Sequence, residues 1–509
     1  MQKQSWTFYL LFVVFSITLG AFQYGYHTGE LNTPQQMISK CKVSKDLTLT
    51  IGDDLLPPCL PMSDARYSLV VAMLLAGGLI GALSASYISD KHGRRKALVY
   101  TNLMLGSGSF LMTISPNIPI LMLGRFIAGI GGGIITVVVP AYISECVPKS
   151  TRGFFGTLNQ LAIVVGIMVS QIIGMMIKTG WRWILFFGVV AAIVQLSFLP
   201  FCVDSPRYLA SKLGGTHKAK QSLLRLRGPP IEDVEEEIEE WRREALNNNN
   251  NSNSPNSLNH ESSSSSALLS SVSNDSTHHD NSIVTIKSFI FDKQHRHPLF
   301  LILLLQLSQQ FSGINAVIFY STSIMSTVFP EYSDRITVFI SVVNLIMTLI
   351  SAYLMDKSGR RTLFLWSTSM MACSSLLLGW SIKTQHDKTS AIAIVAFVAA
   401  FAIGLGPIPF LMIPELVETP AAASAGSIGL ASNMISNFTV SAGFMALRDI
   451  IGQGQVFYVF AVILLIATIL GIKYLPETKN RSTYDIVKSK WAVPNSQYHI
   501  IPHNVSPTE

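Results

Sequence analysis

The sequence predicts an all-α integral membrane protein with about twelve transmembrane helices in two pseudo-symmetric six-helix halves. Three observations predict this fold. The 509 residues are 49% hydrophobic and only 13% charged, whereas soluble chains carry about 25% charged residues. About twelve apolar segments are long enough to cross a bilayer. A cationic motif, DKHGRRKAL at 90–98, returns as DKSGRRTLF at 356–364, which indicates an internal repeat.

The expected spans fall into two groups on either side of a long polar stretch. They lie at 6–26, 67–89, 97–115, 118–144, 155–177 and 182–202, and then at 298–328, 335–355, 362–382, 390–417, 423–446 and 456–475. Each is close to the length that a tilted helix needs to span a membrane. The N-terminal half is therefore predicted at 1–202 and the C-terminal half at 298–482.

The remaining polar segments are a loop at 203–297 and a tail at 483–509. Within the loop, 214–227 and 231–245 place apolar and charged residues at helical spacing, which predicts short amphipathic helices. The insert at 246–283 is rich in Asn and Ser and has no periodicity, so its composition predicts disorder.

Basic loops predict the orientation, because short loops rich in Lys and Arg stay in the cytosol. The loops at 90–96 and 356–361 are of this kind, so both termini and the long central loop are expected there. The net charge of +7 is explained by such loops, and no nucleic-acid partner is expected.

The loop at 27–66 falls on the opposite side and contains Cys41 and Cys59. These cysteines can form a disulfide if that side is oxidising, although sequence alone does not show their separation. No cysteine spacing is typical of a metal site, and no nucleotide-binding loop or catalytic triad is present. We therefore expect no enzyme activity, no metal and no cofactor.

Neutral amides at mid-span suggest the candidate binding site. Gln309, Gln310 and Asn315 surround Gly313 within the span 298–328. Uncharged amides are costly at membrane depth unless they face a partner or a polar cavity, and they offer both donors and acceptors to a neutral, hydroxyl-rich ligand. The alternative is that they bind neighbouring helices. Further candidates in other spans are Gln160, Asn344, Asn433 and Asn437.

The segment GLGPIPFLMIPELVE at 404–418 contains three prolines, Pro407, Pro409 and Pro414. Proline interrupts the helical hydrogen-bond ladder, so a bend or gate is expected here. Such a bend would bring Phe410 near the cavity, where an aromatic face can pack on the apolar face of a ligand.

Charged residues at the cytosolic ends of the spans form a second candidate set. The basic members can hold loops in the cytosol, but acidic residues contribute little to topology and indicate ion pairs that break when the halves rock. The predicted cytosolic gate comprises Asp90, Arg94, Arg95, Arg125, Glu145, Arg152, Asp204, Arg207, Asp356, Arg360, Arg361, Glu415 and Glu477.

Several motifs occur in an order that resembles the sugar porter family of the major facilitator superfamily. They are GYHTGELNTPQQ, the paired GRR loops, PAYISE, LNQLAIVVGI, DSPRYL, QLSQQFSGINAV, GLGPIPF and LPETK. They are similar to motifs of facilitative glucose transporters and look like those of fungal hexose transporters. The resemblance implies the major facilitator fold and a sugar or polyol substrate. It also implies sugar contacts at Gln160, Gln309, Gln310, Asn315, Asn344 and Asn433.

The sequence departs from the family pattern at several positions. Glucose-carrying members commonly have tryptophan where this chain has Phe410 and Met434, and an acid where it has Ala402. The arginine expected after PELVE is missing, since Ala421 to Ala423 occupy that region, and Val203 replaces the first proline of the PESPR motif. Glucose specificity does not follow from the resemblance.

His27 stands where proton-coupled relatives have aspartate. Histidine titrates near neutral pH, and Glu30 lies three residues on, so the two could form a proton relay. The alternative is a neutral His27 beside a solvated Glu30 at the helix end, which we favour and which implies facilitated diffusion.

We therefore expect a monomeric transporter, embedded in membrane lipid, that moves a monosaccharide, such as a hexose, or a polyol by alternating access. A proton-coupled carrier and a non-transporting sugar sensor are the alternatives. Relatives occur in internal membranes such as the vacuole, so the choice between these and the plasma membrane stays open.

Overall fold

The structure is a computed structural model, and the residues that it describes leave gaps in the loops and termini. They are 7–40, 56–148, 152–177, 180–210, 216–228, 286–326, 328–329, 331–417, 419–479, 481, 486–487 and 489. The predicted helix at 231–245, the insert at 246–283 and most of the tail at 483–509 lie outside them.

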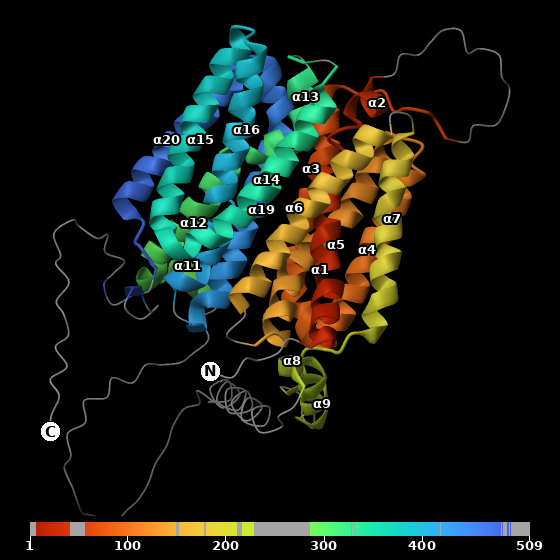
Figure 1. Cartoon of the computed structure of the whole chain (residues 1–509), viewed down its shortest axis with the longest axis vertical. Helices are drawn as coiled ribbons and strands as arrows, with labels where there is room; N and C mark the ends of the chain where they lie inside the picture. Colours follow the sequence, from red (N-terminus) through yellow and green to blue (C-terminus); the bar gives the residue numbers. More distant parts are fainter. Residues whose placement is uncertain are drawn as a thin grey trace, which may run out of the picture.

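Six long helices correspond to the first six expected spans (Figure 1). They are α1 (Phe8–Gly29), α3 (Asp64–His92), α4 (Arg94–Thr113), α5 (Ile118–Cys146), α6 (Arg152–Met176) and α7 (Trp181–Phe198). Side-chain oxygens cap three of them, because Thr7, Ser63 and Asn117 accept backbone N–H bonds from the first turns of α1, α3 and α5.

The remaining expected spans correspond to a second set of helices, two of them interrupted. The set is α12 (Arg296–Phe311), α13 (Ile314–Ser326), α14 (Ser333–Ser358), α15 (Arg360–Lys383), α16 (Asp387–Ile403), α17 (Ile408–Leu411), α18 (Ile413–Leu416), α19 (Thr419–Ile451) and α20 (Gln455–Tyr474). One break separates α12 from α13 at Gly313, whose φ is 85°. The other lies before Pro407, as the proline-rich segment predicts.

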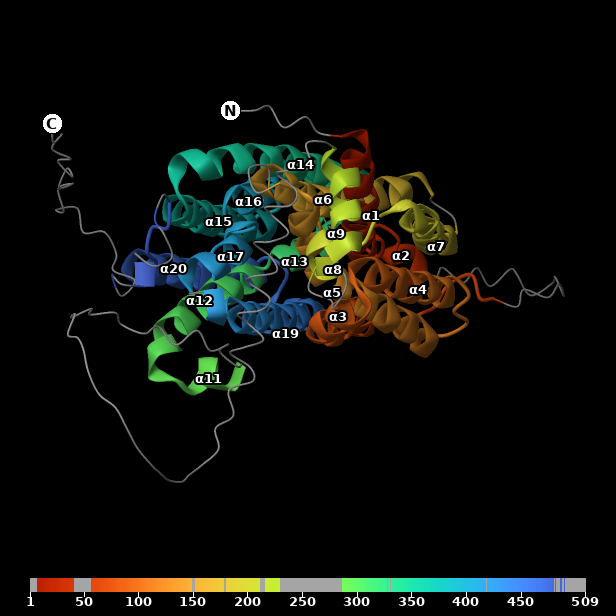
Figure 2. The same cartoon turned by 90° about the horizontal axis from the view of Figure 1, so that it is seen from below.

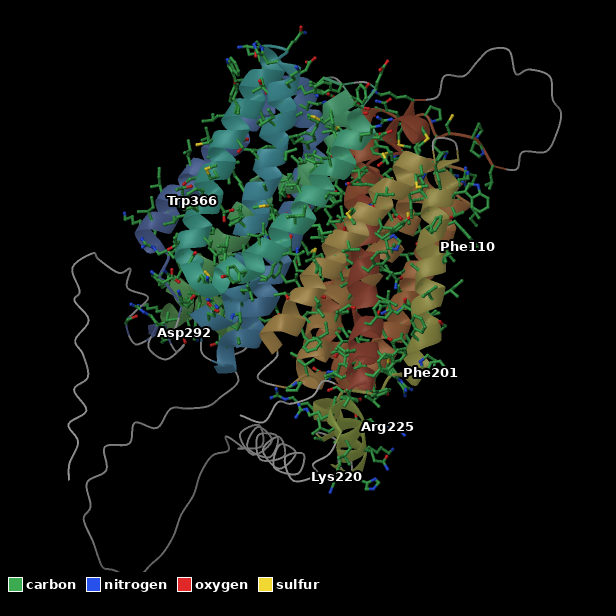
Figure 3. All side chains as sticks on the ribbon, viewed as in Figure 1. Phe110, Phe201, Lys220, Arg225, Asp292 and Trp366 are labelled. Atoms are coloured by element: carbon green, nitrogen blue, oxygen red, sulfur yellow. The ribbon has the colours of Figure 1, made fainter. Side chains whose placement is uncertain are left out.

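Short helices occupy the connections. They are α2 (Gln35–Ser39), α8 (Pro206–Ala210), α9 (Thr216–Arg227) and α11 (Ile286–Phe291). The helix predicted at 214–227 is confirmed as α9, which projects beyond the long helices and carries Lys220 and Arg225 (Figure 3). Phe110 and Trp366 point outward from the bundle in the same view and are 50% and 63% exposed, as expected for side chains that face lipid.

Ten helices among the described residues are long and apolar enough to cross a membrane. The two expected spans that fall short of this criterion are α4 and α19. The first begins with Arg94, Arg95 and Lys96, and the second carries Asn433 and Asn437 in a run of small residues. Both helices lie within the bundle and carry candidate functional residues, which lower their hydropathy.

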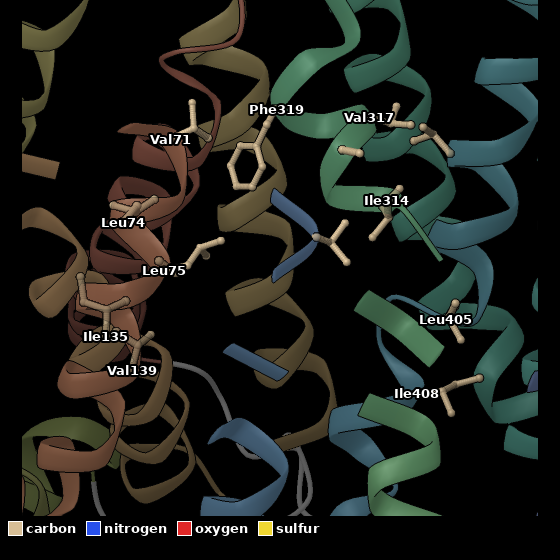
Figure 4. Packing of buried hydrophobic residues seen from close by; sticks show 14 of the residues in the cluster. Val71, Leu74, Leu75, Ile135, Val139, Ile314, Val317, Phe319, Leu405 and Ile408 are labelled. Carbon is tan, nitrogen blue, oxygen red and sulfur yellow. The ribbon is translucent and has the colours of Figure 1, made fainter. Parts of the chain in front are cut away.

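The N-terminal helices α1 to α7 lie beside the C-terminal helices α12 to α20 (Figure 2). The two groups meet where α3 packs against α19 and α6 packs against α14. Buried apolar side chains of α3 and α5, including Val71 and Ile135, belong to the same core as Ile314 of α13 and Leu405 (Figure 4).

The two ends of the bundle differ, and we name them here. The GRR end holds Gly93-Arg94-Arg95 and Gly359-Arg360-Arg361, at the junctions of α3 with α4 and of α14 with α15. The distal end is the opposite one, where α1 ends and α3 begins. The basic loops that predict the cytosolic side are at the GRR end.

Candidate functional site

Five buried amides, which we call the carboxamide cluster, lie around the two helix breaks. They are Gln306, Gln309, Gln310, Asn315 and Asn433. Each is at most 9% exposed. Four come from α12 and α13 and the fifth from α19, so the cluster joins helices far apart in sequence. Gln306 was not among the predicted site residues, although its spacing of three from Gln309 places both on one face of α12.

Asn433 is the centre of this cluster. Its Nδ2 donates to Oε1 of Gln306 and to Oε1 of Gln309, each at 2.7 Å. Its Oδ1 accepts from Nε2 of Gln310 at 2.9 Å. Gln310 in turn accepts a hydrogen bond from Asn315. Because every bond in this network is neutral, the site is suited to a ligand without charge.

Gln309 has a second role, at the break between α16 and α17. Its Nε2 donates to the carbonyl oxygens of Leu405 at 2.9 Å and Gly406 at 2.7 Å. In a continuous helix the Leu405 carbonyl would bond the N–H of residue 409, but proline has none. The neighbouring Gln306 donates to the carbonyl of Pro409 at 3.2 Å. Gln309 therefore satisfies the Leu405 carbonyl that Pro409 leaves without a partner, and Gln306 adds a further bond to the backbone of this proline-rich segment.

A ligand can use the hydrogen-bonding groups of the cluster that the backbone does not occupy. Both N–H donors of Gln309 are used by the backbone, whereas its Oε1 accepts only from other amides. A hydroxyl can both donate and accept. A polyhydroxylated ligand can thus replace the bonds between amides one for one, without disturbing the bonds that hold the break.

The other predicted binding residues lie outside this network. Asn344 on α14 is 7% exposed and Gln160 on α6 is half-buried; neither side chain bonds to the cluster within the part of the chain that the structure describes. Asn437 accepts from Ser441 at 3.1 Å, one turn beyond Asn433 on α19. Phe410 is 44% exposed, so its ring does not share the burial of the amides.

The predicted charged residues of the N-terminal helices meet at the GRR end. Arg94 pairs with Asp90 at 3.1 Å and with Glu145 at 2.9 Å. The backbone N–H groups of Arg94 and Arg95 both donate to Oδ1 of Asp204, at 3.1 and 3.3 Å. Gly93 has a φ of 92°, and a Cβ there would lie 2.5 Å from Asp204, so only glycine fits beside this carboxylate.

The C-terminal helices repeat the same arrangement. Arg360 pairs with Glu415 at 3.3 Å, and its backbone N–H donates to Glu477 at 2.9 Å. Gly359 takes the place of Gly93, with a φ of 85° and Glu477 against it. The sequence repeat therefore extends to the carboxylate that each glycine faces. These pairs join residues of the same group of helices, so a cytosolic gate between the two groups stays a prediction.

Five further residues of the predicted gate complete the comparison. Arg95 donates to the carbonyl of Cys202 at 3.1 Å and Arg361 to that of Ile472 at 2.9 Å. Arg207 is exposed. The side chain of Arg152 and that of Asp356 lie outside the described residues.

Arg125 corrects one assignment, because it does not lie at the GRR end. It is in the second turn of α5, far from Glu145 at the other end of that helix, and it is fully buried. Its Nη1 donates to Oε1 of Glu30 at 2.9 Å and to the carbonyl of His27 at 2.6 Å. Grouping Arg125 with the cytosolic charges was wrong, since α5 runs from the distal end toward the GRR end.

His27 and Glu30 complete this buried triad. Nδ1 of His27 lies 3.0 Å from Oε1 of Glu30, and Nε2 lies 3.4 Å from Oγ of Ser109. A carboxylate only accepts, so Nδ1 carries the hydrogen, and the ring is satisfied when neutral. The expectation of a solvated Glu30 was wrong: its exposure is 0%. The pairing with Arg125 explains how a carboxylate is tolerated there.

Polar contacts that the sequence did not predict tie the two groups of helices together at the distal end. Asn32, just after α1, donates to the Ile318 carbonyl at 2.7 Å and to Ser321 at 2.8 Å, and accepts from the N–H of Thr322 at 3.2 Å. Ser68 donates to the Ala442 carbonyl at 2.9 Å. Single Asn and Ser residues carry no pattern that would have identified them.

A second buried amide group, also missed, lies among α1, α4 and α7. Gln23 donates to Asn102 at 3.0 Å and to Gln195 at 2.6 Å, and Gln195 donates to the carbonyl of Ser16 at 2.9 Å. These side chains are at most 1% exposed and hold helices of one group together. They illustrate the alternative role expected for amides inside spans.

Cys59 is disulfide-bonded, and its predicted partner, Cys41, lies outside the described residues. Among the described cysteines, Cys146 and Cys202 are free and buried. Within the described ranges no group of three or more His, Cys, Asp and Glu side chains could hold a metal ion.

Comparison with known proteins adds independent evidence. The family described as sugar (and other) transporter matches residues 13–489. The chain is 35% identical to the facilitated glucose transporter member 3 of Ovis aries, over 94% of this chain and 92% of the relative. It is 32% identical to a probable metabolite transport protein of Saccharomyces cerevisiae, over 93% of each chain.

Solved structures agree in fold. The xylose transporter of E. coli in its inward-open conformation gives a TM-score of 0.73 at 21% identity and covers 95% of this chain and 100% of its own. The same proton:xylose symporter bound to 6-bromo-6-deoxy-D-glucose gives 0.71, covering 95% and 99%.

Proposed function

Because this chain belongs to the sugar transporter family, we propose that it carries a neutral monosaccharide, such as a hexose, or a polyol across the bilayer by alternating access. The observation that supports this most directly is the carboxamide cluster. Its five amides are buried beside two helix breaks, and they bind one another through neutral hydrogen bonds that hydroxyl groups can replace. The relatives named as glucose transporters agree with such a substrate.

The site is proposed to open toward the GRR end in the state described here. Among the described residues, hydrogen bonds between the two groups of helices lie at the distal end, for example at Asn32 and Ser68. At the GRR end the described ion pairs of Arg94 and Arg360 stay within their own group. With the basic loops in the cytosol, this is a state that faces the cytosol, and both termini lie there. The carrier acts as a monomer.

Facilitated diffusion is the proposed mode of transport. The buried triad contains one cation, Arg125, one anion, Glu30, and a His27 that is satisfied when neutral. Its net charge is therefore zero without an added proton. A proton on Glu30 would leave Arg125 as an unpaired buried charge, which is costly.

Uptake of labelled hexose into proteoliposomes tests the transport proposal. Gln310→Ala removes a cluster member and is expected to raise the KM at least about tenfold, since one ligand hydrogen bond contributes roughly 1.4 kcal/mol. Gln36→Ala, an exposed amide on α2, is the matched control and should leave the KM unchanged. Competition by hexoses, pentoses and inositol then identifies the substrate class. Sugar binding without uptake would instead support the sensor alternative.

A pH gradient tests the mode of transport. The initial rate and the final level of uptake are expected to be the same with and without an inward proton gradient. Accumulation above equilibrium that requires the gradient, and that His27→Gln or Glu30→Gln removes, would instead support the proton relay.

A further inference from the structure

An ion pair joins the two groups of helices at the distal end. Nη2 of Arg448, in the last turn of α19, lies 2.7 Å from Oδ2 of Asp64, in the first turn of α3. The two side chains are 16% and 20% exposed, so water screens the pair only in part. Within the described ranges the other contacts between the groups include neutral hydrogen bonds of Asn32 and Ser68 and a bond that Ser341 of α14 donates to Gln171 of α6. The pair of Arg448 and Asp64 differs from these because both of its partners are charged.

Each of the two charged side chains keeps a favourable interaction with its own helix when the pair is broken. An aspartate at a helix N-terminus and an arginine at a helix C-terminus each interact favourably with the helix dipole. Arg448 also forms an ion pair with Asp449 at 2.8 Å, and Asp449 is 55% exposed. Because Asp449 is on the same helix, it remains paired with Arg448 when α3 moves away. The contact can therefore open and close without leaving a bare buried charge.

We propose that Asp64 and Arg448 form a latch that sets how much time the carrier spends closed at the distal end. This inference rests on the proposed alternating access. Opening the distal end separates α3 from α19 and must break this pair, whereas closing reforms it. The latch thus favours the state that faces the GRR end, and it lowers the rate at which substrate enters from the distal side.

Thiol labelling tests the latch without using substrate. Ser68 of α3 is fully buried against Ala442 of α19 and is changed to cysteine. The parent carries Cys373→Ser, because Cys373 is free and exposed and would react with the reagent itself. A membrane-impermeant thiol reagent is added from the distal side. Asp64→Asn and Arg448→Gln are each expected to raise the labelling rate about fivefold, the size of effect that a partly buried ion pair has on a two-state equilibrium.

Two variants serve as controls. Arg448→Lys keeps the cation and should label at the rate of the parent. Asp449→Asn removes only the partner on the same helix and should not raise the rate. Labelling of Asp64→Asn at the parental rate, with the variant shown to be folded by its thermal unfolding, would overturn the latch. Absence of sugar uptake by the parent would overturn the proposed function instead, because labelling is measured without sugar.

Discussion

At the scale of single residues, two amides of the carboxamide cluster differ in the groups that they bond to. Asn433 bonds only to other side chains, all of which a ligand can replace. Gln309 commits both donors to the backbone of Leu405 and Gly406. Substitution of Asn433 should therefore affect chiefly affinity, whereas substitution of Gln309 should affect stability as well.

The buried triad gives the first prediction. Glu30→Gln leaves Arg125 without its carboxylate in a fully buried position, so we expect a loss of about 3–5 kcal/mol in stability. The thermal unfolding of purified protein in detergent measures it. Glu331→Gln, an exposed site, is the control. The double variant Glu30→Gln/Arg125→Met removes both charges and should recover much of the loss; a double variant as unstable as the single would contradict the explanation.

Sequence reasoning at this scale identified residue types better than partners. Four of the five amides were predicted from their polarity within spans, but Gln306 was missed. The favoured expectation of a solvated Glu30 was wrong, since Glu30 is buried against His27 and Arg125. Arg125 was assigned to the wrong end, because a sequence motif does not show how far along a helix a charge lies from the loop. Asn32 was missed because its three bonds reach a helix almost 290 residues away, which local spacing does not encode.

At the scale of elements, the two interrupted spans position the cluster. Gly313 ends α12 with a φ of 85°, and the ring of Phe460 packs where a Cβ would lie. The prolines end α16, and side chains from other helices bind the carbonyls that lose their partners. Ser351 of α14, for example, donates to Ile403 at 2.7 Å, the residue four before Pro407.

This compensation gives a second prediction. Gln309→Leu leaves the carbonyls of Leu405 and Gly406 without donors and should cost about 1–3 kcal/mol for each. Adding Pro409→Ala restores an N–H that can reach Leu405, so the double variant should be more stable than Gln309→Leu alone. Thermal unfolding of the three proteins measures this. Pro414→Ala restores no N–H near Leu405 and should give no rescue; equal rescue by both would refute the mechanism.

The paired glycines give a third prediction. Gly93→Ala and Gly359→Ala place a methyl group 2.5 and 2.6 Å from carboxylate oxygens of Asp204 and Glu477, and both backbones have positive φ. Each change should cost about 1–3 kcal/mol. Gly156→Ala is the control, since a Cβ there has no atom within 4 Å. If Gly156→Ala destabilises the protein as much, steric conflict is not the cause.

The elements were predictable to a large extent because their signals are local. Apolar length predicts a span, and proline or glycine within it predicts a break. The hydropathy signal was weakest for α4 and α19, where polar and small side chains replace large apolar ones. The hydrogen bonds that Gln306 makes with Pro409 and Asn433 could not be predicted, because they depend on how three helices pack together.

At the scale of the whole molecule, the two groups of helices are joined at the distal end, and this gives a fourth prediction. Cysteines at Ser68 and Ala442, which contact each other across α3 and α19, should be cross-linked by a short bifunctional thiol reagent, with uptake falling at least about tenfold. A cross-link between Ser375 and Phe457, within the C-terminal helices, should leave uptake intact. Full uptake by the first cross-linked protein would contradict alternating access.

The sequence repeat predicted the matched Gly-Arg-Arg motifs, and the structure extends the match to their carboxylate partners Asp204 and Glu477. Which end of the bundle carries the contacts between the two groups of helices could not be predicted. A carrier that alternates has one sequence and several arrangements, so the contacts between its halves belong to a state and not to the sequence.

The pairing of Arg125 with Glu30 inside the buried triad also affects how the membrane voltage acts on the carrier. One charge moved across the bilayer couples to the field by about 2.3 kcal/mol per 100 mV. A cation and an anion that travel together through the field cancel this term, so the rocking of this buried group requires no electrical energy. In the proposed facilitated mode with an uncharged substrate, flux is therefore expected to follow the concentration difference of the solute and not the membrane potential.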